Sequence, residues 1–193
     1  TNAIYFGGQK SPGSATETES YDGTSWTETS DLGTGREGLS GSGTAVAGLA
    51  TAGYVAPAVK ANTEEFHITH SVVTAGAWAN GENLNTARKD GGGAGTQTAG
   101  LAFGGKTDTV VNNSEEYDGS SWTEGDNLGT AREHLEGCGT QTAALGVSGE
   151  APPFVTNTEE YNGSSWSEVT DISAARGLGQ MVGLQTAALF TGG

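Results

Sequence analysis

One segment of this sequence returns at a nearly fixed interval, and this periodicity constrains the fold more than any other feature. Residues 95–105 return as 139–149, and weaker copies occupy 43–53 and both ends of the chain. Equivalent positions are 45, 52, 44 and 44 residues apart. Such a period indicates one supersecondary unit per repeat, with neighbouring copies stacked to bury a shared core. The aligned positions are Thr1, Val46, Thr98, Thr142 and Thr186.

Composition taken alone predicts disorder. Gly, Thr, Ala and Ser make up about half of the chain, Leu, Ile, Val and Phe only about 16%, and the net charge is -15. The few large residues nevertheless recur at the same position of each repeat. A disordered chain has no need for such regular spacing, so we expect a folded array. The recurring structural positions are Tyr21, Trp26, Arg36, Phe66, Trp78, Arg88, Tyr117, Trp122, Arg132, Tyr161, Trp166 and Arg176.

The charge balance and hydropathy exclude two classes of partner. Eight basic residues against 23 acidic ones leave no basic face for a phosphate backbone, so we expect no nucleic-acid partner. No apolar run approaches the ~18 residues that a membrane span needs. We therefore expect no membrane span.

The pattern within each repeat predicts four short antiparallel strands, and helical periodicity is absent. In the third repeat we expect strands near 89–95, 98–103, 113–117 and 121–124. Asp118-Gly119 lies between the last two, and Asp-Gly or Asn-Gly favours a tight turn there. The predicted class is all-β, as a single array over residues 1–193. Its repeats cover about 1–45, 46–97, 98–141 and 142–185, with a partial fifth at 186–193, and we expect a window on a longer chain.

The order of these motifs resembles the kelch repeat over essentially the whole chain. The resemblance implies a β-propeller with one four-stranded blade per repeat, Gly-rich inner strands, and Trp and Tyr or Phe filling the space between blades. The spacing from Tyr to Trp is shorter than in kelch repeats, and the Gly-Gly doublet becomes Ala52-Gly53 and Ser148-Gly149. The motif is carried in the third repeat by Gly104, Gly105, Tyr117, Trp122, Leu128 and Arg132.

The amino-acid sequence of residues 139–145 and 117–122 resembles repeat arrays in virion structural proteins of marine tailed bacteriophages. This resemblance implies a non-enzymatic structural and recognition module in a tail fibre or appendage, located in the virion or outside the cell. Its partners would be other virion or surface proteins or a host-surface glycan, and an oligomer is compatible with it. One alternative is a secreted lectin-like or adhesion propeller, and another is a copper-oxidase-like or glycosidase enzyme.

The recurring charged residues admit a functional and a structural interpretation. One arginine per repeat could form an anion-binding ring, but a Glu two residues before each aromatic favours a repeated structural pair. The adjacent Glu-Glu residues point to opposite faces of a strand and so do not converge on one ion. We predict no catalytic residues, no metal site and no cofactor.

An insertion breaks the grid in the second repeat, where residues 67–76 replace the tight turn. Insertions in repeat proteins often mark the binding face, as do variable connections such as 9–16, 54–61 and 150–156. His67 and His70 could hold a metal with a third ligand, but we favour a polar loop. His134 and Cys138 are expected to share a face of one inner strand. The predicted binding residues are His67, Thr69, His70, Ser71 and Thr74.

Overall fold

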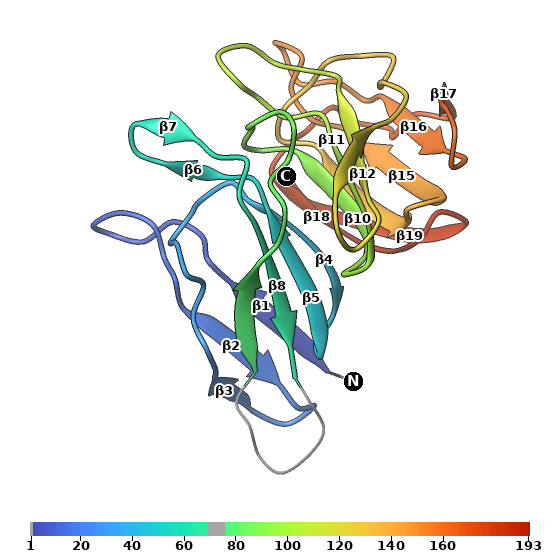
Figure 1. Ribbon diagram of the computed structural model, residues 1–193. Helices are drawn as coiled ribbons and strands as arrows, with labels where there is room; N and C mark the ends of the chain where they lie inside the picture. The colour runs from blue at the N-terminus through green and yellow to red at the C-terminus, as the bar shows by residue number, and fades with distance from the viewer. Residues whose placement is uncertain (1, 69–75) are drawn as a thin grey trace.

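The repeats fold into a series of small antiparallel β-sheets (Figure 1). The computed structural model describes residues 2–68 and 76–193. All helices and strands that it assigns in these residues are β-strands, with no helix among them. The predicted all-β class is therefore confirmed. Among the described residues, no helix has the length and apolar character to cross a membrane.

Three sheets have four strands, and we call them units 2, 3 and 4. Within each, the strands pair in chain order, so the first strand lies at one edge and the fourth at the other. Unit 2 consists of β4 (Ser40–Thr44), β5 (Ala47–Thr51), β8 (Thr63–His67) and β9 (Ala77–Asn80). Unit 3 consists of β10 (Gly92–Thr96), β11 (Ala99–Phe103), β12 (Ser114–Tyr117) and β13 (Trp122–Glu124). Unit 4 consists of β14 (Glu136–Thr140), β15 (Ala143–Val147), β16 (Thr158–Tyr161) and β17 (Trp166–Glu168).

The sheets at the two ends are incomplete. Unit 1 has the second to fourth strands of the repeat, which are β1 (Ala3–Phe6), β2 (Thr18–Tyr21) and β3 (Trp26–Glu28). Unit 5 has only the first two, β18 (Gly179–Leu184) and β19 (Ala187–Gly192). A separate hairpin of β6 (Tyr54–Val55) and β7 (Ala58–Val59) projects from unit 2.

The strands of unit 3 lie close to their predicted positions, except that the first begins three residues later. Asp90 has a φ of 56°, which is the left-handed region, so the extended strand cannot start before it. The predicted turn between third and fourth strands is present: Gly119 has a φ of 90°, and the Asp118 carboxylate accepts hydrogen bonds from the backbone N–H groups of Ser120 and Ser121.

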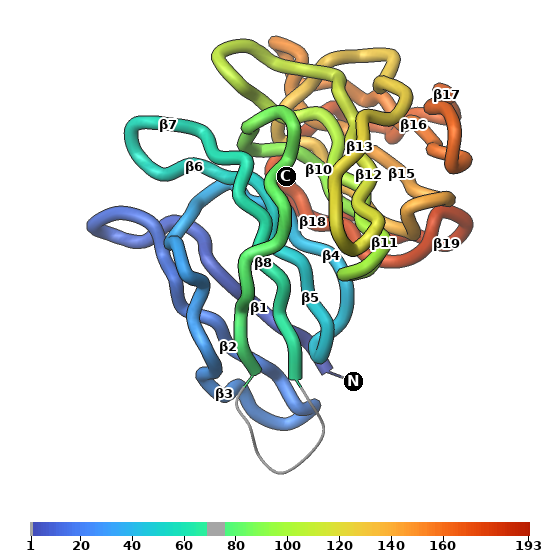
Figure 2. The backbone as a smooth tube through the Cα atoms, viewed as in Figure 1, coloured from blue at the N-terminus to red at the C-terminus, as the bar shows by residue number. Residues whose placement is uncertain are grey.

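The first strands lie side by side in the middle of the molecule, where β10 contacts β4 and β14, and β14 contacts β18 (Figure 2). The close approach explains the glycines of these strands. A Cβ on Gly137 would lie 2.8 Å from the carbonyl oxygen of Gly93 and 2.5 Å from the Phe103 ring. Only glycine fits there without a shift of the neighbouring sheet.

The core lies between consecutive sheets, in interfaces that we call joints. Between units 3 and 4, Trp166 packs on Phe103 with ring centroids 4.8 Å apart, together with Leu101, Leu128 and Tyr161. A second cluster, including Leu49, Tyr117 and Trp122, fills the joint between units 2 and 3. The aromatic positions of the repeat thus hold the sheets together, with one exception: Trp26 is 51% exposed, so the prediction that every Trp fills an inter-sheet space is wrong at this position.

Candidate functional site

Three of the four repeated arginines are buried in the joints and paired with glutamates. Arg36, Arg88 and Arg132 place a guanidinium nitrogen 3.1, 2.5 and 3.0 Å from a carboxylate oxygen of the next sheet's third strand. Burial lowers the pKa of each arginine, and the facing carboxylate opposes that shift. The partners are Glu64, Glu115 and Glu159 respectively.

These carboxylates also fasten the connection between sheets. Glu115 accepts hydrogen bonds from the backbone N–H groups of Asn85 at 2.6 Å and Thr86 at 3.1 Å, in addition to Arg88. Glu64 and Glu159 accept equivalent bonds from Gly33 and Gly129. Arg36, Arg88 and Arg132 therefore have structural partners and do not form an open anion-binding ring.

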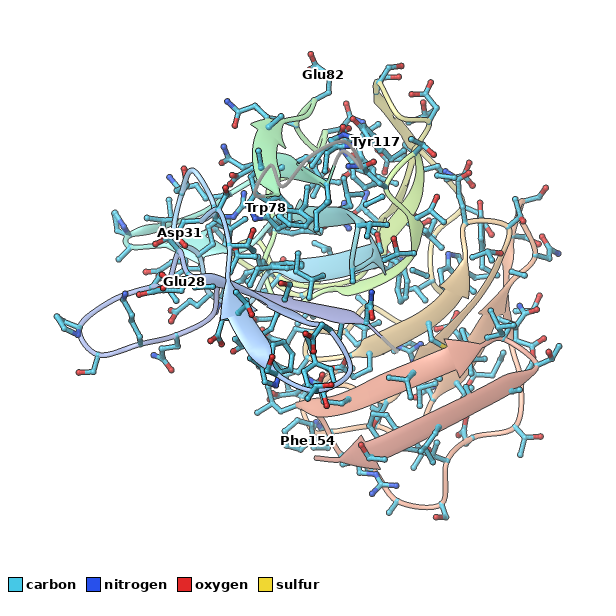
Figure 3. The ribbon with its side chains drawn as sticks, turned by 90° about the horizontal axis from the view of Figure 1, so that it is seen from below. Glu28, Asp31, Trp78, Glu82, Tyr117 and Phe154 are labelled. Atoms are coloured by element: carbon cyan, nitrogen blue, oxygen red, sulfur yellow. The ribbon has the colours of Figure 1, made fainter. Side chains whose placement is uncertain are left out.

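Aromatic polar groups reach back to the preceding sheet. The indole N–H groups of Trp78, Trp122 and Trp166 donate hydrogen bonds of 3.1, 3.0 and 3.3 Å to side-chain hydroxyls in the preceding sheet. Each hydroxyl belongs to the first residue of that sheet's third strand. In Figure 3, Trp78 lies inside the stack of side chains, whereas Glu82 points outward. The accepting hydroxyls belong to Thr18, Thr63 and Ser114 respectively.

The Glu-Glu pairs separate to opposite faces, as the strand geometry predicts. Glu115 faces Arg88, while its neighbour Glu116 accepts a hydrogen bond from the Tyr161 hydroxyl in the next sheet. Tyr117 makes the same contact with Glu65 at 2.5 Å. Burial, followed by the carboxylate contact, raises the pKa of both tyrosines above the usual value.

The predicted insertion site is described only at its start. His67 ends β8, and its ring nitrogen lies 3.0 Å from Gln97 Nε2 and 3.4 Å from the Glu65 carboxylate. It therefore joins the contacts between units 2 and 3. The other predicted residues, Thr69, His70, Ser71 and Thr74, lie outside the described residues.

The expectation that His134 and Cys138 share a strand face is wrong. His134 has a φ of 54° and precedes β14, because this left-handed residue cannot continue an extended strand. Its ring lies 3.7 Å from Asp90 and 3.5 Å from Glu150. Cys138 is buried within β14, and burial raises the pKa of its thiol, which makes it a poor nucleophile.

A charged cluster around His134 was not predicted from the sequence. Asp90, Glu133 and His134 place ligand-type atoms within 4.8 Å of one another. The Lys106 ammonium lies 2.8 Å from Glu133, however, and Lys89 lies 3.0 Å from Asp90. The carboxylates are thus compensated by lysines, and the cluster is a salt-bridge network. Its only sequence signal is position, since Asp90 and His134 both follow a repeat arginine by two residues.

A cavity of about 330 Å³ lies where the first strands begin. Residues of β1, β4, β10, β14 and β18 line it, among them Ser40, Gly92, Glu136 and Gln180, which are equivalent in the repeat. Burial raises the pKa of the Glu136 carboxyl to about 7. This cavity therefore carries a carboxyl that titrates near neutral pH.

The connections between second and third strands form hairpins of similar design. The hairpins of units 2, 3 and 4 each begin with a backbone bridge to the residue that follows a repeat arginine: Glu37 with Tyr54, Lys89 with Lys106, and Glu133 with Glu150. The hairpin of unit 1 is closed by a bridge between Gln9 and Ser14 instead. The hairpin sequences differ from repeat to repeat, although the anchoring in units 2, 3 and 4 is the same.

The first two hairpins enclose a groove of about 470 Å³. Residues 9–14 form one wall, and Glu37, Tyr54 and Ala56 form the other. Figure 1 shows these two hairpins as neighbouring projections at the left of the molecule. The groove combines an aromatic ring with a lysine and a glutamate, which suits a polar ligand with an apolar face. Two of the connections singled out from the sequence thus lie together.

Comparison of the sequence with protein-family models finds no match, and neither does comparison with curated proteins.

Proposed function

We propose that this chain is a non-enzymatic structural and recognition module, built as a kelch-like β-propeller that displays hairpins to a partner surface. The observation that carries the proposal is the pairing of constant anchors with variable tips. Equivalent backbone bridges anchor the hairpins at residues 54–59, 106–110 and 150–154, while the sequences of these hairpins differ. Loops on a rigid scaffold are the usual location of binding residues.

The propeller architecture is supported by three features of the sheets. Each complete sheet is a four-stranded meander, its first strand lies at the centre, and units 2 and 3 are each packed between the sheets before and after them. The buried Arg–Glu pairs, made by charged residues of the repeat, hold consecutive sheets together. A crystal structure in which the first strands surround one axis would support the architecture, and a stack without a common axis would contradict it.

We also propose that the module belongs to an appendage of a tailed-phage virion, on the resemblance of its repeat sequence. Mass spectrometry of purified virions from the source would test this assignment. Peptides of this chain in intact particles are the expected result, and their absence would favour the secreted alternative.

The groove between the first two hairpins favours a glycan as ligand, which the lectin-like alternative shares. The groove is lined by Tyr54, whose ring has the Lys89 ammonium 5.5 Å from its centroid, by Lys10, which pairs with Glu17, and by Glu37, so an aromatic ring and charged groups lie together. We expect binding on an array of immobilised glycans, and a loss of about tenfold or more in Tyr54→Ala. Asp108→Ala, on the exposed hairpin of unit 3, is the matched control and should bind normally. Equal binding by both variants would exclude this groove as the site.

A further inference from the structure

The turn between the third and fourth strands of unit 4 carries an Asn-Gly pair where units 1 and 3 carry Asp-Gly. Asn162 and Gly163 lie between β16 and β17, at the edge of the molecule (Figure 1). The same positions are Asp22-Gly23 in unit 1 and Asp118-Gly119 in unit 3. An asparagine followed by glycine is reactive, because the glycine nitrogen can attack the side-chain amide carbon and no Cβ obstructs the approach. The dipeptide makes this turn a candidate for spontaneous deamidation.

The turn polarises the amide carbonyl of the Asn162 side chain. Its Oδ1 accepts hydrogen bonds from the backbone N–H groups of Ser164 at 2.9 Å and Ser165 at 3.0 Å. These bonds fold the side chain back over the peptide that contains the Gly163 nitrogen. When that nitrogen attacks, negative charge develops on Oδ1, and two backbone donors at such distances stabilise an oxyanion. The folded turn therefore favours attack on the amide carbon.

The groups that react at this turn are accessible. Among the described residues, the Gly163 backbone N–H has no hydrogen-bond acceptor. Gly163 has a φ of 87°, which glycine adopts without strain. Asn162 is exposed, and its Nδ2, the leaving nitrogen, donates a hydrogen bond to the Ser165 hydroxyl at 3.2 Å. Solvent can thus take the proton from the attacking nitrogen and supply the water for hydrolysis.

The chain contains the Asn-Gly pair a second time, at Asn80-Gly81, and there the backbone is held in a sheet. Asn80 ends β9 opposite Glu64, and the Gly81 N–H donates to the Thr63 carbonyl oxygen at 2.9 Å. Exposure does not distinguish the two sites, because Asn80 and Asn162 are both exposed and the glycine that follows each is half-buried. The Gly81 nitrogen must break its hydrogen bond before it can attack. Backbone pairing is therefore the difference between the two sites.

An aspartate at position 162 would fit the turn, because two other units already have one. The carboxylates of Asp22 and Asp118 each accept two backbone N–H hydrogen bonds of 2.8–2.9 Å. Asn162 makes the same two bonds through its amide oxygen. The Ser120 hydroxyl and the backbone donors bind the charged form of Asp118 and lower its pKa to about 2. The turn thus stabilises a carboxylate.

We propose that Asn162 is a site of spontaneous deamidation in the folded protein, which converts the turn of unit 4 to the acidic form of units 1 and 3. The Gly163 nitrogen loses its proton to solvent and bonds to the side-chain carbon of Asn162, while the amide nitrogen gains a proton and leaves as ammonia. The inference depends on the chemistry of one turn, and so goes beyond the recognition function proposed above.

Water then opens the cyclic succinimide. Attack at the former side-chain carbonyl breaks its new bond to the Gly163 nitrogen and gives an ordinary aspartate. Attack at the backbone carbonyl breaks the original peptide bond and gives an isoaspartyl linkage through the side chain. Both products replace a neutral amide by a carboxylate, so each event makes the net charge of -15 more negative by one.

Peptide mapping by mass spectrometry, after incubation of the folded chain at mildly alkaline pH, tests the proposal. Asn80 and Asn162 are followed in the same sample. We expect Asn162 to convert at least about tenfold faster, because Gly81 must first leave its hydrogen bond in the sheet. In water enriched in heavy oxygen, the new carboxyl group should contain oxygen from the solvent.

The same measurement in urea separates the effect of the turn from that of the dipeptide. In the unfolded chain we expect Asn80 and Asn162 to convert at similar rates. Equal rates in the folded protein, or a faster rate at Asn80, would overturn the proposal. So would an Asn162 that converts in urea but not in the folded protein, since the turn would then protect it. Asn162→Gln is the matched control and should gain no charge at this turn, because its longer side chain requires a larger ring.

Asn162→Asp tests the end product directly. We expect its thermal unfolding midpoint to equal or exceed that of the wild-type chain, because the carboxylate accepts the same backbone hydrogen bonds as Asp118. A lower midpoint would contradict the equivalence of the three turns and with it the proposed end state.

Discussion

The joint between units 3 and 4 differs from the joint between units 1 and 2 in its polar contacts. Both contain the Trp–hydroxyl bond and the buried Arg–Glu pair. The later joint adds a Tyr161 bond to Glu116, and Gln141 donates to the carbonyl oxygens of Gly100 and Tyr117. The earlier joint has neither addition.

The earlier joint lacks both partners of the missing tyrosine–glutamate contact. Phe66 replaces the tyrosine and Ser20 replaces the glutamate, while Ala45 stands in the glutamine position. The joint is more apolar instead, with Phe6 and Phe66 both packed on Trp78 at 4.9 and 5.2 Å. If only the tyrosine or only the glutamate were replaced, the remaining one would be a buried group without a hydrogen-bond partner. The fold therefore tolerates the two replacements only together. The Trp–hydroxyl bond and the Arg–Glu pair thus form the minimal joint.

The largest effect is expected from the buried ion pairs that both joints share. Glu115→Ala should lower the free energy of unfolding by about 3–5 kcal/mol, because it leaves the Arg88 guanidinium buried without its carboxylate. Glu19→Ala, at the equivalent exposed position, should change it by less than about 0.5 kcal/mol. Urea unfolding of both variants measures the difference, and equal losses would contradict the structural role of the pair.

A smaller effect is expected from the indole bond. Trp166→Phe should cost about 1–3 kcal/mol, since it removes the indole hydrogen bond to the Ser114 hydroxyl, which keeps only its bond to the Asp126 carbonyl oxygen, and leaves space where the larger ring packed. Trp26→Phe should cost almost nothing, because its indole has no partner among the described residues. Chemical unfolding compares the two, and a matching loss in Trp26→Phe would argue against an exposed Trp26.

In the central cavity, unit 4 has a titratable glutamate, Glu136, where unit 5 has Gln180, so stability should depend on pH through unit 4. Burial raises the pKa of Glu136 in the folded state to about 7, above its ordinary value of 4.5, so the folded state retains a proton that the unfolded state has lost. Stability should therefore fall as pH rises from about 4.5 to about 7. Glu136→Gln, which copies Gln180 of unit 5, should remove this fall and stabilise the protein at pH 8 by on the order of 1–2 kcal/mol. Thermal unfolding at pH 5 and pH 8 tests the sign.

The smallest effect would come from restoring the missing contact in the earlier joint. Ser20→Glu and Phe66→Tyr together should gain about 0.5–1.5 kcal/mol relative to the sum of the single variants, because only the pair forms the hydrogen bond. A double-mutant cycle by urea unfolding measures this coupling. Zero coupling would mean that the two joints differ in geometry as well as in residues.

Much of the fold was predictable because the pattern is local and repeated four times. The period predicted the all-β class, and Asp118-Gly119 placed the turn between the third and fourth strands of unit 3. The prediction failed for the start of β10 and for His134, because Asp and His favour the left-handed region only weakly, so the positive φ of Asp90 and His134 was not expected. The sequence predicted that the repeated arginines pair with the glutamates. It did not predict that these pairs connect consecutive sheets.

The sequence by itself determined the periodic positions of the aromatic, acidic and arginine residues and hence the strands that carry them. Only the tertiary structure decided which of these residues meet. Trp122 and Thr63 are 59 residues apart in the chain, and Gln97 and Gly48 are 49 apart, so their contacts exist only after the sheets stack. The same stacking distinguishes chemically identical positions. Trp26 and Trp122 share one motif, but only Trp122 is covered by a neighbouring sheet, because burial depends on what packs against a residue.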